Sequence, residues 1–308
     1  MTIEELNDAV ESGEIGETIR VAEARQQKTL SKIADDICGR SGVRLVLLAG
    51  ASSAGKTTTA KRICTQLRVN GAEALLLSTD DYFVGDRRNP RDENGELDDE
   101  HVDCVDRERL AADINALMRA ETVHPRKFDF VAHEGFDADG EISLPKGGYI
   151  VLEGIHALNP LLTAGIADEC KYRMFIEPKT QIEIFAMTSL KPEDGRFLRR
   201  MVRDNQFRKM SPFQTMALWP KVLEGEKKWI NPFAKDVDAT FDSGLNYELA
   251  VLKPYVAGLL EIVKMKNPAD ARINGLVELL GAIQPADPGL VPGDSILRET
   301  IGGSQLEY

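Results

Sequence analysis

The sequence predicts an α/β protein in which helices cover both faces of a mainly parallel sheet, a three-layer α/β/α arrangement. Three short and nearly continuous apolar runs, at 43–49, 74–78 and 149–152, have the length of strands buried on both faces. Segments with helical spacing separate these runs, and a glycine-rich turn joins the first run to the helix that follows it. Strands that alternate with helices in this way are typical of parallel sheets.

The first third of the chain gives the clearest order of elements. Residues 1–40 carry apolar side chains at helical spacing and predict one or two short helices. The strand at 43–49 is followed by a predicted helix over 57–70 and then by the strand at 74–78. This succession is a βαβ unit, in which the two strands are parallel.

The remainder of the chain is less regular. A polar loop covers residues 84–104, and prolines beyond residue 266 predict an extended tail with one helix over 273–280. The other predicted elements are a helix over 110–119, strands over 149–152, 172–176 and 240–243, and helices over 181–210 and 249–266.

The composition excludes several classes of protein. The chain has 308 residues with 38 basic and 50 acidic side chains, so its formal net charge is −12. Such an acidic surface disfavours binding to nucleic acid and to anionic membranes. No apolar stretch is long enough to span a bilayer, and the acidic N-terminus does not resemble a signal peptide. We expect a cytoplasmic protein without nucleic-acid or membrane partners, and the sequence leaves open whether it forms a homo-oligomer.

The cysteines and histidines carry no disulfide or zinc signature. Cys38, Cys64, Cys104 and Cys170 are far apart in the sequence and form no C-x-x-C pair. The four histidines also lack the spacing of a zinc site. This usage fits free thiols in a reducing compartment.

The glycine-rich turn is the strongest functional motif. Residues 50–57 match the P-loop pattern G-x-x-x-x-G-K-[ST], and they begin where a buried strand ends and lead into a helix. Lys56 supplies a cation for the β- and γ-phosphates, and the Thr57 hydroxyl suits Mg²⁺. The alternative is an ordinary Gly/Ser turn, but this context favours a nucleoside triphosphate site on a P-loop NTPase-type fold. The residues expected to bind the triphosphate here are Gly50, Ala51, Ser52, Ser53, Ala54, Gly55, Lys56, Thr57 and Thr58.

Two acidic residues follow predicted strands, at the edge where parallel sheets bind ligands. Asp80 follows the strand at 74–78, which we expect to lie beside the strand that leads into the P-loop. Its carboxylate can take a proton from an acceptor hydroxyl or help to order the metal. Glu153 follows the strand at 149–152 and can reach the metal, often through water. The alternatives are that Asp80 caps a helix and that Glu153 is a structural acid.

A basic cluster lies between residues 191 and 209 of this acidic chain. Arg196, Arg200 and Arg203 are spaced at i, i+4 and i+7, so they share one face of a helix. Such a face can close over a triphosphate as a lid and stabilise charge on the transferring group. The alternative is a solvated helix face. The basic residues of the cluster are Lys191, Arg196, Arg199, Arg200, Arg203, Arg208 and Lys209.

Six motifs in order resemble the phosphoribulokinase/uridine kinase family, and segments at 211–220 and 295–304 resemble a bacterial uridine-kinase-like subgroup of it. The resemblance implies a kinase domain at 41–265, flanked by an N-terminal helical extension at 1–40 and by a C-terminal extension at 266–308 that packs on the domain. The motifs are the P-loop at 50–57, Ser-Thr-Asp-Asp-Tyr-Phe at 78–83, an acidic segment at 98–106, Phe-Asp-Phe-Val-Ala-His at 128–133, Glu-Gly-Ile at 153–155 and Arg-x-x-Arg-Asp at 200–204.

The resemblance implies roles for individual residues. Asp80 would take the proton of the acceptor hydroxyl, and Lys56 and Arg203 would stabilise the transferring phosphoryl group. ATP would also contact Arg200 and Arg208. The residues expected at Mg²⁺ are Thr57 and Glu153. The residues expected to bind the acceptor are Asp80, Tyr82, Asp98, Glu100, Phe128 and His133, of which His133 has the alternative of a satisfied polar residue in a loop. The resemblance places Glu100 at the sugar hydroxyl, with Asp98 and Asp99 as the alternatives at that position.

We therefore expect ATP- and Mg²⁺-dependent phosphoryl transfer to a hydroxyl of a small molecule, and the resemblance favours a nucleoside 5′-hydroxyl. Phe128 stands where uridine kinases usually have a tyrosine, so uridine itself is not implied. Pantothenate, a sugar phosphate or another small alcohol is the alternative acceptor. An ATP-binding regulatory module without a dedicated acceptor is the alternative from another class. A sugar phosphate would need basic residues near the acceptor, for which the candidates are Arg87, Arg88, Arg91, Arg126 and Lys127.

Overall fold

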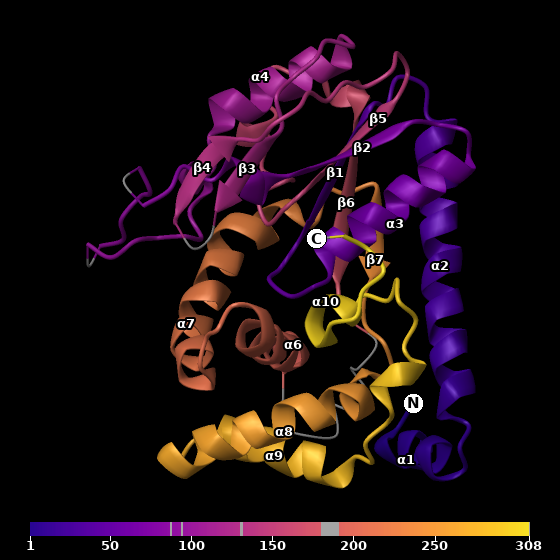
Figure 1. Ribbon diagram of the computed structural model, residues 1–308, viewed down its shortest axis with the longest axis vertical. Helices are drawn as coiled ribbons and strands as arrows, with labels where there is room; N and C mark the ends of the chain where they lie inside the picture. The colour runs from indigo at the N-terminus through magenta and orange to yellow at the C-terminus, as the bar shows by residue number, and fades with distance from the viewer. Residues whose placement is uncertain (87, 94, 130–131, 180–190, 308) are drawn as a thin grey trace.

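The computed structural model describes the whole chain except residues 87, 94, 130–131, 180–190 and 308. Its centre is a five-stranded parallel sheet in the order β2-β5-β1-β6-β7 (Figure 1). Each strand pairs with its neighbours in parallel register. The parallel sheet predicted from the apolar runs is therefore confirmed. The strands are β1 (Leu45–Gly50), β2 (Ala74–Ser78), β5 (Tyr149–Glu153), β6 (Lys171–Glu177) and β7 (Ala239–Asp242).

Helices cover both faces of this sheet and complete the three layers (Figure 1). Leu45, Leu47 and Ala49 of β1 pack with α4, whereas Val46 and Leu48 pack with α2 and α3. The alternation follows from the two-residue period of a strand, and it explains why the whole run is apolar. The helices of these layers are α2 (Ile15–Gly39), α3 (Lys56–Val69) and α4 (Arg107–Met118).

Helix α2 is longer than the sequence pattern indicates. The prediction of one or two short helices over residues 1–40 is wrong in length, because α2 runs for 25 residues. Leu30, Ile33, Ala34 and Ile37 form one apolar stripe and share a core with the sheet. Burial of this stripe against the sheet, more than local propensity, stabilises a helix of this length.

A second group of helices packs below the sheet in Figure 1 around a core of its own. The sequence pattern does not predict α7, although Ser211 and Gln214 form a capping box at its start. Of the helix predicted over 181–210, the part at 181–190 lies outside the described residues. The helices of this group are α1 (Ile3–Glu11), α6 (Pro192–Phe207), α7 (Pro212–Gly225), α8 (Glu248–Lys266) and α9 (Ala271–Ala282).

A small antiparallel hairpin stands apart from the main sheet. Its strands are β3 (Arg126–Asp129) and β4 (Glu134–Asp137), and they pair only with each other among the described residues. The remaining elements are the short helix α10 (Arg298–Ile301), the 3₁₀ turns η1 (Thr79–Tyr82), η2 (Val102–Cys104), η3 (Pro160–Leu162), η4 (Asp168–Cys170), η6 (Asn231–Phe233) and η7 (Pro288–Leu290), and the π-helical turn η5 (Glu226–Ile230).

Two further properties concern the chain as a whole. Within the described ranges, no helix combines the length and the apolar character needed to cross a bilayer. All four cysteines lie in the described part of the chain, and all are free.

Candidate active site

The P-loop lies between the end of β1 and the start of α3, as its motif predicts. Gly55 is the N-cap of α3 and has a φ of +84°, a left-handed conformation that glycine adopts without strain. A side chain at Gly55 would also collide with Cγ2 of Ile296. The first amides of α3 have no carbonyl partner within the helix. They therefore offer hydrogen-bond donors, and the positive end of the helix dipole, to an anion.

Glu153 ends β5, the strand that pairs with β1. Its Oε1 accepts hydrogen bonds from Thr57 Oγ1 at 3.2 Å and from Ser78 Oγ at 2.8 Å. Burial, and then the charge of Asp80, raise the pKa of Glu153 to about 7. A cation beside this carboxylate would offset the cost of its burial, and hydroxyl and carboxylate oxygens are ligands that Mg²⁺ prefers. Thr57 and Glu153 therefore fit the metal.

Asp80 reaches the same cavity from β2. The expectation that β2 lies beside β1 is wrong, because β5 lies between them. Asp80 nevertheless enters the cavity, because the turn η1 follows β2 directly. Ser78 caps this turn, and its Oγ accepts from the Asp80 amide at 3.3 Å. The carboxylate of Asp80 is thus not needed as a cap.

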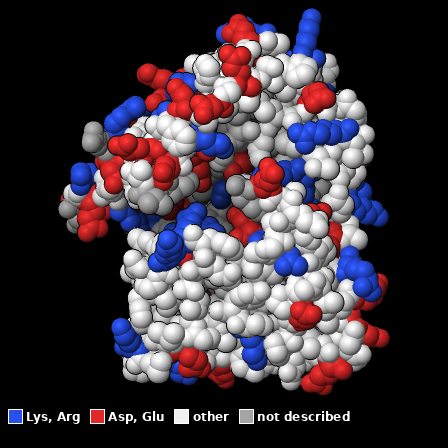
Figure 2. Space-filling view, viewed as in Figure 1, with Lys and Arg blue, Asp and Glu red and all other residues white. Residues whose placement is uncertain are grey.

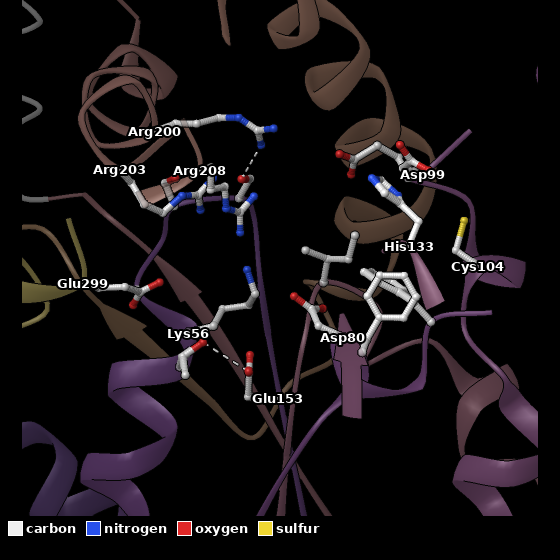
Figure 3. A pocket seen from close by; sticks show the side chains of 18 of the residues that line it. Lys56, Asp80, Asp99, Cys104, His133, Glu153, Arg200, Arg203, Arg208 and Glu299 are labelled. Atoms are coloured by element: carbon white, nitrogen blue, oxygen red, sulfur yellow. Dashed lines mark hydrogen bonds between the residues drawn. The ribbon is translucent and has the colours of Figure 1, made fainter. Parts of the chain in front are cut away.

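These groups line one cavity of about 280 Å³. Figure 2 shows a hollow between the part that carries β3 and β4 and the part that carries α6 and α7. In Figure 3, Lys56 stands between Glu299 on one side and Asp80 on the other. We call the side of Lys56 and Glu299 the P-loop end, and the side of Asp80, Phe128 and His133 the hairpin end. The predicted residues that line the cavity are Ser52, Ser53, Gly55, Lys56, Thr57, Asp80, Glu100, Phe128, His133, Glu153, Arg200, Arg203 and Arg208.

Helix α6 brings arginines to the P-loop end (Figure 3). Nη1 of Arg200 donates to Oγ of Ser52 at 2.7 Å, which ties the helix to the P-loop. Asp204 is fully buried and accepts from Nη2 of Arg203 at 2.6 Å. The same carboxylate lies 3.2 Å from Nε of Arg200 and 3.9 Å from Nε of Arg208. One buried acid therefore orients three guanidinium groups at the cavity.

Two other arginines of α6 have structural roles. Arg199 and Glu248 are each 1% exposed and form a buried ion pair. Arg196 pairs with Glu226 at 2.8 Å and donates to the Ser52 carbonyl oxygen at 3.2 Å, but it does not line the cavity within the described chain. The prediction that Arg196 belongs to the lid surface is therefore wrong, because its guanidinium is used in packing.

Aromatic and acidic side chains form the hairpin end. The rings of Phe83 and Phe128 meet edge to face with centroids 5.5 Å apart. Nδ1 of His133 lies 3.2 Å from Oδ1 of Asp86. His133 therefore has a partner in its loop and still lines the cavity. This end offers an apolar ring surface and negative charge.

Glu100 lines the cavity, and α7 packs against it. A side chain at Gly225 would collide with Cβ of Glu100, so this close contact requires glycine. Burial, partly offset by the charges of Arg200 and Lys56, raises the pKa of Glu100 to about 7. Glu100 thus joins the loop before α4 to the helical group that carries the arginines.

A comparison of the sequence with models of known families assigns the chain to a family. The sequence model of the Phosphoribulokinase / Uridine kinase family matches residues 45–250, which is more than half of the chain. The chain belongs to this family. The resemblance carried by the six ordered motifs is confirmed, and the family description names two small-molecule kinases.

Uridine kinases of other organisms match about half of the chain. The uridine kinase of Leuconostoc citreum is 25% identical over 157 residues, which are 51% of this chain and 66% of that protein. The uridine kinase of Deinococcus deserti is 28% identical over 165 residues, 54% of this chain and 70% of that protein. The chain thus spans about two thirds of the length of these relatives. A solved structure described as a possible uridine kinase from Bacillus stearothermophilus is 17% identical, with a TM-score of 0.47, and covers 71% of this chain and 100% of that chain.

Two residues that the family resemblance assigns to the acceptor lie outside the cavity in the structure as described. Tyr82 is buried, and its hydroxyl donates to Oδ2 of Asp113 in α4 at 3.0 Å. Oδ1 of Asp98 accepts a hydrogen bond from the Glu100 amide at 3.3 Å. The backbone carbonyl oxygen of Asp98 accepts one from Cys104 Sγ at 3.0 Å. Both side chains thus support the loop, and the described cavity gives no support to the roles that the resemblance implies for Tyr82 and Asp98.

The basic residues that a phosphorylated acceptor would need are engaged elsewhere. Arg87 lies outside the described residues. The other four do not line the described cavity, and each has another partner. These partners are Asp106 for Arg88, the Gly95 carbonyl for Arg91, Asp137 for Arg126 and Asp81 for Lys127.

The structure also adds cavity residues that sequence reasoning missed. Glu299 lies beyond the family match at 45–250, and its Oε2 accepts from Thr58 Oγ1 at 3.0 Å. The segment at 295–304 resembles a uridine-kinase-like subgroup, but that resemblance gives Glu299 no role, since only the folding of the tail onto the P-loop brings it to the cavity. The segment at 98–106 already signals an acidic loop, but not which acids face inward. The residues added at the hairpin end are Phe83, Asp86, Asn89, Cys104 and Ile155, and Asp99, the alternative to Glu100, lines the cavity as well.

Proposed function

We propose that the protein is an ATP- and Mg²⁺-dependent kinase that phosphorylates a hydroxyl of a small molecule, with a nucleoside 5′-hydroxyl as the first candidate. One observation carries this proposal: Lys56 of the P-loop, Asp80 and Arg203 line the same cavity. Phosphoryl transfer needs such a cradle, proton acceptor and positive charge. Family membership and the uridine kinases among the relatives support the same reaction.

The reaction follows from the roles of these side chains. The acceptor oxygen bonds to the γ-phosphorus while the bond from that phosphorus to the β–γ bridging oxygen breaks, and ADP leaves. Asp80 takes the proton of the acceptor hydroxyl. Lys56 and Arg203 stabilise the negative charge that spreads over the transferring group. Arg200, held on Ser52, keeps α6 against the P-loop and limits the access of water.

Thr57 and Glu153 would hold the metal, because their oxygens already meet at the end of β5. Bound Mg²⁺ would supply positive charge that neutralises phosphate oxygens. Deprotonated Glu153 suits this role, and the hydrogen bond from Ser78 keeps its carboxylate in place.

The hairpin end favours an uncharged acceptor over a phosphorylated one. Asp80, Asp86, Asp99 and Glu100 face this part of the cavity, so a second phosphate there would meet like charge. The Phe83–Phe128 ring pair offers a surface on which a planar base can stack. Both properties support a nucleoside more than a sugar phosphate.

The experiment is an acceptor screen on the purified chain with MgATP, in which ADP release is measured with nucleosides, sugar phosphates, pantothenate and small polyols. Asp80→Asn should lower the acceptor-stimulated rate by about 10²- to 10⁴-fold and leave the Kd of MgATP unchanged. Asp81→Asn is the matched control, because Asp81 pairs with Lys127 and does not line the described cavity.

Two results would overturn parts of the proposal. If a sugar phosphate stimulates ADP release and no nucleoside does, the proposal of a nucleoside acceptor is refuted. A slow hydrolysis that no acceptor stimulates, and that Asp80→Asn does not change, would identify an ATP-binding regulatory module instead.

The organisation of the chain stays a proposal as well. The proposed division is a kinase domain at 41–265 with extensions at 1–40 and 266–308. Both extensions share a core with the domain, since α2 packs on the sheet and the tail packs on α6. A cytoplasmic location stays a prediction from composition.

A further inference from the structure

The C-terminal segment at 295–303 is built into the P-loop end of the cavity, although it lies outside the family match at 45–250. Ile296 is buried in the core of the sheet, and Leu297 and Ile301 are buried in the core of the helical group. Figure 1 shows α10 between α3 and α6, and it packs against α6. The segment is therefore fixed from two sides, and so is the backbone that carries Glu299.

Several contacts set the position of Glu299. Its Oε2 accepts from Thr58 Oγ1 at 3.0 Å, within the first turn of α3. Ile296 fills the space beside Gly55. Nη1 of Arg298 donates to the Gly302 carbonyl oxygen at 3.2 Å and closes the short helix. A carboxylate on such an anchored segment is positioned before any ligand arrives.

A carboxylate lies on each side of Lys56, so the position of the base sets the direction of a bound nucleotide. Asp80 lies on one side of Lys56 and Glu299 on the other (Figure 3). If the γ-phosphate faces Asp80, the α-phosphate and the nucleoside extend past Thr58 toward Glu299. This step rests on the proposed function, because it takes Asp80 to be the base.

The charge of Glu299 narrows what it can bind. An ionised carboxylate accepts hydrogen bonds and donates none, so it repels phosphate oxygens and attracts hydroxyl groups. The first hydroxyl groups beyond the α-phosphate of a nucleotide are those of the ribose. We propose that Glu299 binds the ribose hydroxyls of the nucleoside triphosphate and selects nucleotides that carry them.

Equilibrium binding to the full chain tests this assignment. The Kd values of MgATP and of Mg-2′,3′-dideoxy-ATP are measured by calorimetry for the wild type and for Glu299→Ala. Since a hydrogen bond to a charged group is strong, the wild type should prefer ATP by about tenfold to a hundredfold. Glu299→Ala should remove this preference by weakening the binding of ATP, with little effect on the dideoxy analogue. The single 2′- and 3′-deoxy analogues then identify the hydroxyl.

Two further variants control for damage to the fold. Glu299→Gln retains an oxygen that can accept from Thr58 and should keep part of the preference. Asp294→Ala removes an exposed acid of the same tail, outside the described cavity, and should behave as the wild type. A wild type that binds both nucleotides equally, or a preference that survives in Glu299→Ala, would overturn the assignment.

The outcome is separable from that of the proposed function, because binding needs no turnover. If no acceptor is phosphorylated but the preference is present and depends on Glu299, the kinase proposal fails and the ribose site stands. If acceptors are phosphorylated but the preference is absent, only the ribose site fails.

Discussion

The P-loop end and the hairpin end of the cavity are built in different ways. The P-loop end rests on the sheet and on two long helices, and buried Asp204 orients its arginines. The hairpin end is carried by the loop before α4, by β3 and β4, which pair only with each other in the described chain, and by the turn η1, which holds Asp80. Strands and helices thus hold Lys56 and the arginines, whereas turns and loops hold Asp80 and the groups for the acceptor. Apart from Asp80, whose proposed role is in the chemical step, changes at the two ends should therefore affect different kinetic constants.

Among changes at the P-loop end, the largest effect is expected from Lys56→Met. Loss of this cation should lower kcat by about 10³-fold and also weaken the binding of MgATP. Steady-state kinetics and calorimetry measure the two effects. Lys32→Met, an exposed change on α2, is the control. A variant that loses only acceptor affinity would contradict the assignment of the two ends.

Two arginines of α6 should separate catalysis from stability. Arg203→Ala should lower kcat by about 10²-fold, because its guanidinium lines the cavity. Arg199→Ala should lower the free energy of unfolding by about 3–5 kcal/mol, because it leaves Glu248 buried without its partner. Denaturant unfolding and kinetics of both variants test this. The reverse pattern, with Arg203 setting stability and Arg199 setting kcat, would refute the division of the cluster.

A smaller and selective effect is expected at the hairpin end. Phe128→Ala should raise the KM of a nucleoside acceptor about tenfold, since stacking on the ring is lost. The KM of ATP should not change, and Phe128→Tyr should retain most of the affinity. Initial rates at varied acceptor and ATP concentrations distinguish the two constants. An equal rise in both would mean that the ends are not independent.

The smallest effect concerns the pH dependence of stability through Glu100. Its pKa is raised to about 7 in the folded protein, so folding favours the protonated carboxyl. That contribution is present below the unfolded pKa and is lost as the pH rises through about 7. Glu100→Gln should therefore match the wild type near pH 4.5 and be more stable at pH 8, by up to about 1 kcal/mol after solvent screening. A variant that is less stable at pH 8 would contradict this.

Sequence reasoning predicts what continuous segments encode. The strand runs and the P-loop motif each occupy adjacent residues, so pattern alone identifies β1, α3, Lys56 and Thr57. The motif at 153–155 likewise identifies Glu153. The sequence pattern does not predict that β5 lies between β1 and β2, because strand order depends on how the layers pack.

Some site residues could not be predicted because their roles depend on contacts between distant parts of the chain. Arg199 and Arg203 are the same residue type four positions apart. Arg199 is buried in a pair with Glu248, whereas Arg203 pairs with Asp204 and lines the cavity, and the sequence does not distinguish these two environments. The hydroxyl of Tyr82 points to α4, which its motif cannot indicate. Glu299 reaches Thr58 across most of the chain, so no window of sequence contains both. The direction of side chains and the contacts between distant segments are therefore the features of the site that the sequence does not predict.

A crystal structure of the chain with Mg²⁺ and a non-hydrolysable ATP analogue is the sharpest test of the roles proposed for Lys56 and Asp80. We expect the β- and γ-phosphates at Lys56, the carboxylate of Asp80 facing the γ-phosphorus from the hairpin end, and the ribose beside Glu299. An analogue bound the other way round, with its nucleoside at Phe128, or an Asp80 carboxylate turned away from the terminal phosphate, would contradict it.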